Sequence, residues 1–320
     1  MKQHSSRELE FMPAFEIDKS VVVRNPEKNA PGYWVGAPSS VVLDDSVYLT
    51  YRIRRPRGEG RGVINRIAMS NDGISFRDLF EIEKSALGNT PSIERSCLVP
   101  VRGGFRLYFS YVNPETSVWQ IDMMEAPSVG EFDIASRKNV LSADVAGAGG
   151  VKDPYIVTMG NFYLMYVSYA PLPQRSTQDL HATSDAFATG LTTSNSGLAV
   201  SSDGINFKWA GEVIGLGKGW DSSTTRISSI ARTGWGFTTF YDGSASIEEN
   251  YEERCGIAIT SDFFHFLRLS VDGPSFLGEG GRSVRYVDSV MFNGKLIYYF
   301  ETTRPDGSHE LRALACAVEG

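Results

Sequence analysis

Short apolar stretches that end in aromatic residues recur along this chain, each just after a turn-forming segment such as Asn293-Gly294. They are VYLTYRI (47–53), FRLYFSYV (105–112), FYLMYVSYA (162–170), GFTTFYDG (236–243) and KLIYYFETT (295–303). Apolar runs of this length, bounded by turn residues, are typical of β-strands. The pattern therefore predicts five strands of one kind.

Each of these stretches lies between further predicted strands. The preceding ones are APSSVVLDD (37–45), SIERSCLVPV (92–101), VKDPYIVTMG (151–160), TTRISSIART (224–233) and RYVDSVMFNG (285–294). The following segments are INRIAMSNDGISF (64–76), VWQIDMMEAPSVGEF (118–132), NSGLAVSSDGINF (195–207), RCGIAITSDFFHF (254–266) and HELRALACAVEG (309–320). The first four of these run strand, turn and a further strand opened by phenylalanine. The fifth stops before its last strand, which FEIDKSVVV (15–23) can supply.

Five repeats of a four-stranded antiparallel meander, each of roughly 60 residues, predict an all-β fold. We expect a five-bladed β-propeller whose ring is closed by the N-terminal strand. Residues 1–12 are then an N-terminal tail, and residues 13–320 are a single propeller domain. The first strand of each blade lines the central tunnel, so the beginnings of these five strands should meet at one mouth.

Composition agrees with a β-rich fold and limits the partners. Of 320 residues, 42% are hydrophobic, 12% are aromatic and 32 are glycines, which favours β-structure with many tight turns. The net charge of −7 argues against a nucleic-acid partner. The sequence contains no apolar run of about 18 residues, so we expect no membrane span, and no secretion signal is visible. Cys97, Cys255 and Cys316 are widely spaced, so we expect reduced thiols in a cytoplasmic protein without metal or cofactor.

Charged and aromatic residues gather at the predicted mouth. They are Trp34, Arg52, Glu94, Arg95, Asp153, Tyr155, Trp220, Asp221, Arg226, Arg285, Asp288 and Glu301, with His309 as a further candidate. Aromatic faces, guanidinium groups and carboxyl pairs are what a site needs to hold a sugar and cleave a glycosidic bond. Crowding carboxylates together also raises the pKa of at least one of them, which suits a general acid.

Each candidate also has a purely structural interpretation. A strand-start aspartate can cap a turn, Trp34 and Trp220 can pack between blades, and His309 can be an edge-strand residue without a role in the site. The aspartates of the S-x-D turns are expected to satisfy backbone groups in hairpins; they are Asp72, Asp203 and Asp262. Convergence of five separate stretches at one mouth favours a functional role for the mouth residues.

Three of these stretches resemble glycoside hydrolase family 130, the mannoside phosphorylases, and more distantly families 43 and 32. They are VYLTYR (47–52), IAMSNDGISF (67–76) and GVKDPYI (150–156), which is similar to the family's Gly-Val-Glu-Asp-Pro-Arg motif. The resemblance implies that Asp153 is the general acid and that Arg52 binds sugar or phosphate. Lys152 stands where the family has glutamate, and Tyr155 where it has arginine. The first blade begins GAPSS, without the aspartate of families 43 and 32.

We therefore expect a glycoside hydrolase-like enzyme that inverts configuration on a small carbohydrate or glycoside. Asp153 would protonate the leaving oxygen while a second carboxylate activates water. Asp221 is the preferred partner because Trp220 and Arg226 surround it; Glu94, Asp288 and Glu301 are the alternatives. A phosphorylase that uses phosphate against Arg52 and Arg226 is a variant. A glycan-binding or repurposed propeller is the competing hypothesis.

Overall fold

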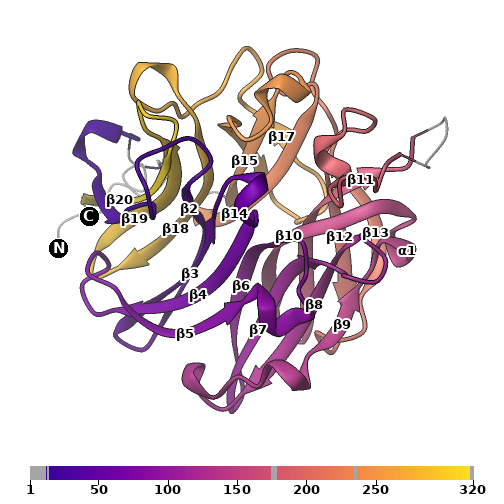
Figure 1. Ribbon diagram of the computed structural model, residues 1–320. Coiled ribbons are helices and arrows are strands. Elements are labelled where there is room, and N and C mark those ends of the chain that lie inside the picture. The colour runs from indigo at the N-terminus through magenta and orange to yellow at the C-terminus, as the bar shows by residue number, and fades with distance from the viewer. Residues whose placement is uncertain (1–11, 13, 174–178, 234–235, 318–320) are drawn as a thin grey trace.

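The computed structural model describes residues 12, 14–173, 179–233 and 236–317. The described residues are mostly β-strand with very little helix (Figure 1). None of the helices in these ranges is long and apolar enough to cross a membrane. The one short α-helix and the 3-10 helices are α1 (Ala143–Ala146), η1 (Ile17–Lys19), η2 (Arg57–Glu59), η3 (Lys84–Leu87), η4 (Val129–Glu131), η5 (Ile134–Ser136), η6 (Ala186–Ala188), η7 (Ile247–Glu249) and η8 (Glu279–Gly281).

The strands form five antiparallel meanders, here called units 1 to 5. Unit 1 is β2 (Trp34–Leu43), β3 (Ser46–Arg54), β4 (Gly62–Ser70) and β5 (Arg77–Glu83). Unit 2 is β6 (Ile93–Val101), β7 (Gly104–Val112), β8 (Trp119–Ala126) and β9 (Lys138–Leu141). Unit 3 is β10 (Ala148–Met159), β11 (Phe162–Pro171), β12 (Asn195–Ser201) and β13 (Lys208–Ile214). Unit 4 is β14 (Thr224–Thr233), β15 (Gly236–Ser244), β16 (Arg254–Thr260) and β17 (Leu267–Arg268). Unit 5 is β18 (Val284–Phe292), β19 (Lys295–Thr303), β20 (His309–Ala317) and β1 (Val21–Arg24).

The N-terminal strand β1 supplies the fourth strand of unit 5, which the sequence of the last repeat lacks. β1 pairs antiparallel with β20, with Val21 opposite Ala313. Units 4, 5 and 1 belong to one 12-stranded sheet, whereas units 2 and 3 are separate four-stranded sheets. The first strands of the units also contact one another in the cyclic order β2, β6, β10, β14, β18 and back to β2. The five strand beginnings are therefore brought to a common centre.

Turn chemistry explains why consecutive strands pair. β18 and β19 are joined by Asn293 and Gly294, whose φ angles are 49° and 71°. Two successive residues with positive φ make the hairpin turn whose twist matches that of the flanking strands. In another hairpin, the Oδ1 of Asp72 accepts the backbone N–H groups of Ile74 and Ser75. The same pattern holds at Asp203 and Asp262, so the S-x-D aspartates have the structural role that the sequence predicts.

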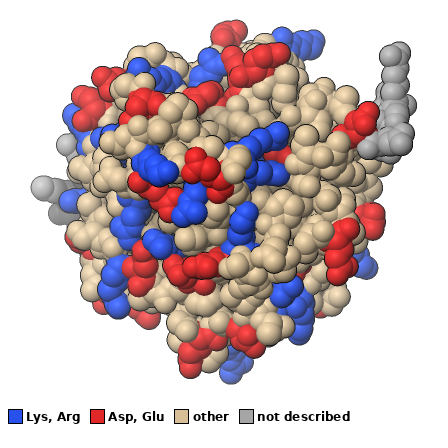
Figure 2. All heavy atoms as spheres, viewed as in Figure 1, with Lys and Arg blue, Asp and Glu red and all other residues tan. Residues whose placement is uncertain are grey.

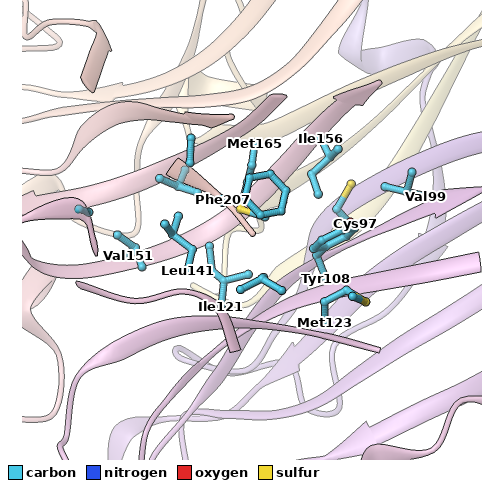
Figure 3. Packing of buried hydrophobic residues seen from close by; sticks show 14 of the residues in the cluster. Cys97, Val99, Tyr108, Ile121, Met123, Leu141, Val151, Ile156, Met165 and Phe207 are labelled. Atoms are coloured by element: carbon cyan, nitrogen blue, oxygen red, sulfur yellow. The ribbon is translucent and has the colours of Figure 1, made fainter. Parts of the chain in front are cut away.

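Apolar residues fill the space between neighbouring units. The cluster between units 2 and 3 includes Tyr108 and Ile121 from one side and Ile156 and Met165 from the other, all less than 9% exposed (Figure 3). On the face of the molecule seen in Figure 2, acidic and basic side chains lie interspersed among uncharged ones. The core holds the units rigidly enough to position side chains at their inner ends.

Candidate active site

A β-bulge interrupts every first strand at the same place. The pairing of first and second strand shifts between Gly36 and Ser39, Ile93 and Ser96, Lys152 and Tyr155, Ile227 and Ser229, and Arg285 and Asp288. Within these bulges Ala37, Asp153 and Tyr286 adopt left-handed φ angles of 51°, 58° and 54°. A non-glycine residue in this conformation costs roughly 1–2 kcal/mol. Bulges of this kind re-aim side chains beside active sites.

Residues at these bulges lie beside residues of the second strands. Gly36, Lys152 and Arg285 directly precede their bulges, Glu94 lies within its bulge, and Arg226 lies one residue earlier. Arg52, Ser168, Asp242 and Glu301 are the second-strand partners of Gly36, Lys152, Arg226 and Arg285. All of the charged members are at most 7% exposed. At Gly36 an added Cβ would lie 2.1 Å from the Oε2 of Glu301, so only glycine leaves room for that carboxylate.

These residues surround a narrow cavity. Its walls are Arg52, Arg54, Glu94, Lys152, Arg226, Glu253, Arg285 and Tyr286, and its remaining lining consists of Phe187, Ser194, Asn250 and Tyr251. Its volume is about 10 Å³, room for about one water molecule. A sugar ring therefore cannot enter this space unless side chains separate, whereas a group of a few atoms needs only a small displacement.

Glu94 lies at one side of the cavity between two arginines. Its Oε2 accepts from Arg52 Nε at 2.5 Å and its Oε1 accepts from Arg54 Nη1 at 2.7 Å. Burial alone would raise the pKa of Glu94, but Arg52, Arg54 and Lys152 lower it to about 2. Glu94 is therefore an ionised anchor for the two guanidinium groups at neutral pH.

Arg226 connects the carboxylates at the other side. It donates to Asp242 through Nε and Nη2, at 3.0 and 2.8 Å. Its Nη1 lies 3.5 Å from Asp153 Oδ2 and 3.7 Å from Glu253 Oε1. Burial raises the pKa of Asp242, against the attraction of Arg226. In Glu253 burial is opposed by Arg226 and Arg285, which lower the pKa to about 2.

Asp153 is wholly buried, one side chain behind the cavity wall. The hydroxyl of Tyr286 lies 3.4 Å from its Oδ2, and the Lys152 ammonium lies 3.7 Å from the same oxygen. Its Oδ1 has no hydrogen-bond partner among the described residues. Tyr286, Lys152 and Arg226 all line the cavity, so these three side chains lie between Asp153 and the cavity.

A third set of buried charged contacts is centred on Glu301. It accepts from Arg285 at 2.7 Å, from the backbone N–H of Ala37 at 2.9 Å, and contacts His309 Nδ1 at 2.7 Å. Burial would raise the pKa of Glu301, but Arg285 and Arg52 hold it well below its usual range. The indole of Trp34 stacks on the His309 ring with centroids 4.5 Å apart. His309 and Trp34 thus support the charged groups from outside the cavity wall.

Five predicted residues lie away from the cavity. Asp221 pairs with Arg268 at 2.8 Å and accepts from Tyr241, and Trp220 donates to the Ser270 carbonyl inside unit 4. The other three contact backbone groups and do not line the cavity; they are Arg95, which donates to the Pro38 carbonyl, Tyr155, which donates to the Ile230 carbonyl, and Asp288, which accepts from Ser40 N. Asp221 is therefore not brought together with Asp153, in contrast to the preferred pairing.

Besides Lys152, Ser194 and Asn250, five lining residues are not among the candidates that the sequence analysis selected. Arg54 lies two residues after Arg52 and therefore points to the same side of its strand. Tyr286 occupies the bulge position that Asp153 has in unit 3. Glu253 and Tyr251 come from the loop before β16, and Phe187 from the connection between β11 and β12. Of these five, only Arg54 and Tyr286 lie in repeated strands, where the sequence pattern could have indicated them. The other three lie in loops that have no counterpart in the repeats.

No group of three or more His, Cys, Asp or Glu side chains in the described part of the chain is arranged to hold a metal ion.

No protein-family model and no curated protein matches the sequence. Solved structures do match in fold. A glycoside hydrolase is 12% identical with a TM-score of 0.68, over 93% of this chain and 90% of that one. A thermostable family-43 glycoside hydrolase is 12% identical with a TM-score of 0.63, over 88% and 89%. A β-1,2-mannobiose phosphorylase from Listeria innocua is 14% identical with a TM-score of 0.58, over 98% and 96%. The chain thus resembles these two glycoside hydrolases and this phosphorylase in fold.

Proposed function

We propose that the five units close into a five-bladed propeller with the charged cavity at its axis. The cyclic contacts of the five first strands support this, as does the β1–β20 pairing. Single parallel bridges, Arg254 with Val284 and Trp34 with His309, join units 4 to 5 and 5 to 1. A cavity at the axis receives side chains from every unit, which suits a site that must surround its ligand.

In this proposal the protein cleaves the glycosidic bond of a small carbohydrate, with Asp153 as the proton donor. The observation that carries the proposal is the free Oδ1 of Asp153, on a fully buried carboxyl in a left-handed bulge. A buried carboxyl oxygen without a partner is unfavourable until a proton or a ligand donor satisfies it. A general acid needs a carboxyl oxygen that is free to face the leaving group, and Oδ1 is such an oxygen.

Glu253 is the carboxylate best situated to work with Asp153. Both contact Arg226 Nη1, so their nearest oxygens are no farther apart than the sum of the two distances, about 7.2 Å. Inverting glycosidases separate their carboxyl groups by about 6.5–9.5 Å and retaining ones by about 5–5.5 Å. The pKa of Glu253, about 2, keeps it ionised, as a base must be. Asp153 and Glu253 would thus divide the acid and base roles.

The competing function is glycan binding without cleavage. It is favoured by Ala37, which occupies in unit 1 the bulge position that Asp153 has in unit 3 and offers no carboxylate. Phosphorolysis is a third possibility, because phosphate in place of water would need cations such as Arg52 and Arg226. Turnover measured with and without phosphate distinguishes them: a binding protein shows none in either case, and a phosphorylase shows it only with phosphate.

The test compares wild-type protein with Asp153→Asn on aryl glycosides, chosen in pairs with good and poor leaving groups. Loss of a general acid should slow poor leaving groups about 10²–10⁴-fold and dinitrophenyl leaving groups far less, because these need no proton. Asp144→Asn, in the exposed part of α1, is the matched control. Equal rates for Asp153→Asn and wild type on poor leaving groups would overturn the role of Asp153. Sugar binding without turnover would favour the binding protein.

A further inference from the structure

Lys152 is a largely buried residue whose ammonium group has no hydrogen bond to the described residues. Lys152 is 7% exposed and lines the cavity. Its Nζ lies 4.7 Å from the ring centroid of Phe187 and 5.4 Å from that of Trp119. The carboxylate oxygen paired with it, Asp153 Oδ2, is 3.7 Å away, beyond hydrogen-bond distance. Among the described residues, none accepts a hydrogen bond from this ammonium, so its donors are left for a ligand.

A second unpaired donor belongs to Arg52. Two of its nitrogens are engaged, Nε with Glu94 at 2.5 Å and Nη2 with Glu301 at 3.3 Å. Its Nη1 is buried and has no hydrogen-bond partner among the described residues. Lys152 and Arg52 both line the cavity, and both lower the pKa of Glu94, which lines it with them.

The walls of the cavity carry more cations than carboxylates. The cations are Arg52, Arg54, Lys152, Arg226 and Arg285, and the carboxylates are Glu94 and Glu253. Asp153, Asp242 and Glu301 equal this excess of three cations in number, but they lie behind the walls and are 0% exposed. A ligand that enters the cavity therefore meets positive groups first. Charge-assisted hydrogen bonds to an oxyanion are the strongest use of such donors.

We infer that the ligand is an acidic sugar whose carboxylate enters the cavity and accepts hydrogen bonds from Lys152 and Arg52. The inference rests on the proposed function and names its substrate class. The size of the cavity favours a carboxylate over a ring, because only a group of a few atoms fits without large movement. The sugar ring would remain outside this space, beside Phe187 and Tyr251, which also line the cavity. Inorganic phosphate could accept the same hydrogen bonds as the sugar carboxylate, so its binding is measured separately.

The experiment measures binding by isothermal titration calorimetry with sugars that differ only at C6. The pairs are galacturonic acid with galactose and glucuronic acid with glucose, and inorganic phosphate is titrated separately. Wild-type protein should bind at least one acid about 10-fold or more tightly than its neutral partner. Lys152→Met should remove this preference and Lys152→Arg should keep most of it. Lys208→Met, at an exposed position of β13, should behave as wild type.

The outcomes separate this inference from the proposed function. Equal binding of acidic and neutral sugars by wild-type protein would overturn the inference, and this comparison does not depend on whether a variant folds. Phosphate binding without any preference for uronic acids would overturn it as well, in favour of a phosphate subsite. Turnover of neutral aryl glycosides that depends on Asp153, without acid preference, would leave the proposed function standing alone. A preference for acids that depends on Lys152, without turnover of any glycoside, would support the inference and remove the catalytic proposal.

Discussion

Replacing Glu253 by glutamine tests whether the cavity holds its carboxylates ionised. Glu253 is 2% exposed and accepts from Arg285 Nη1 at 2.7 Å. Burial opposes ionisation, but Arg226 and Arg285 prevail and lower its pKa from 4.5 to about 2. A carboxylate with a lowered folded-state pKa contributes stability that is present above its unfolded pKa and is lost as the pH falls toward the folded value.

The size of the effect follows from the two pKa values. A change from 4.5 to about 2 corresponds to about 3 kcal/mol of unfolding free energy at pH 7, of which about 2 kcal/mol is lost by pH 3. Glutamine does not titrate. Between pH 7 and pH 3, wild-type protein should therefore lose about 2 kcal/mol more than Glu253→Gln. Burial and, to a smaller extent, the charge of Glu253 raise the pKa of Asp242, so its contribution has the opposite sign, and Glu253→Gln removes the part due to Glu253.

Urea denaturation at the two pH values measures this difference, provided that the m-values of the two proteins agree. The control is Glu115→Gln, which replaces an exposed glutamate and should change stability equally at both pH values. If the stability difference between wild type and Glu253→Gln is the same at pH 7 and pH 3, the two arginines do not lower the pKa of Glu253. The assignment of Glu253 as an ionised base would then fail.

Two further substitutions test the contacts of the buried Glu301 carboxylate. Gly36→Ala should destabilise by about 1–3 kcal/mol, because the new Cβ would lie 2.1 Å from Glu301 Oε2. Calorimetry should show a lower Tm than for Gly130→Ala, whose Cβ meets no heavy atom within 4 Å, and equal Tm values would contradict the close approach. Glu301→Gln removes the charge that pairs with Arg285 and Arg52, and should cost about 3–5 kcal/mol in urea denaturation. A loss no larger than that of Glu115→Gln would show that this buried pair is dispensable.

The repeats predicted the strands because turn chemistry and apolar patterning act locally. Segments such as KLIYYFETT (295–303) reappear as second strands with nearly the same bounds. The place of β1 beside β20 also followed, because one unit lacked a strand. The outer strand of unit 4 was predicted less well: β17 has two residues, since Leu269 N and Ser270 N both turn to the Ile257 carbonyl.

The site was predicted only in part because the bulges change which side chains face the cavity. Side chains alternate along a strand, so one inserted residue reverses the direction of those that follow. Arg285 precedes its bulge and Glu94 is the first residue of its bulge, and both line the cavity, whereas Arg95 and Asp288 come after the first bulge residue and contact backbone groups. Glu253 could not be found from the repeats, because its loop before β16 has no counterpart in the other units.

The charged centre is difficult to explain by stability alone. Replacing buried ion pairs by apolar residues is often neutral or stabilising, and buried polar atoms are rarely left without partners. Here Asp153 Oδ1 and Arg52 Nη1 are buried and unpartnered among the described residues, and Asp153 also adopts a left-handed backbone. Each feature opposes folding, and both lie within the same network. A ligand with a donor for Asp153 and an acceptor for Arg52 would relieve both, so binding free energy can offset what folding leaves unsatisfied.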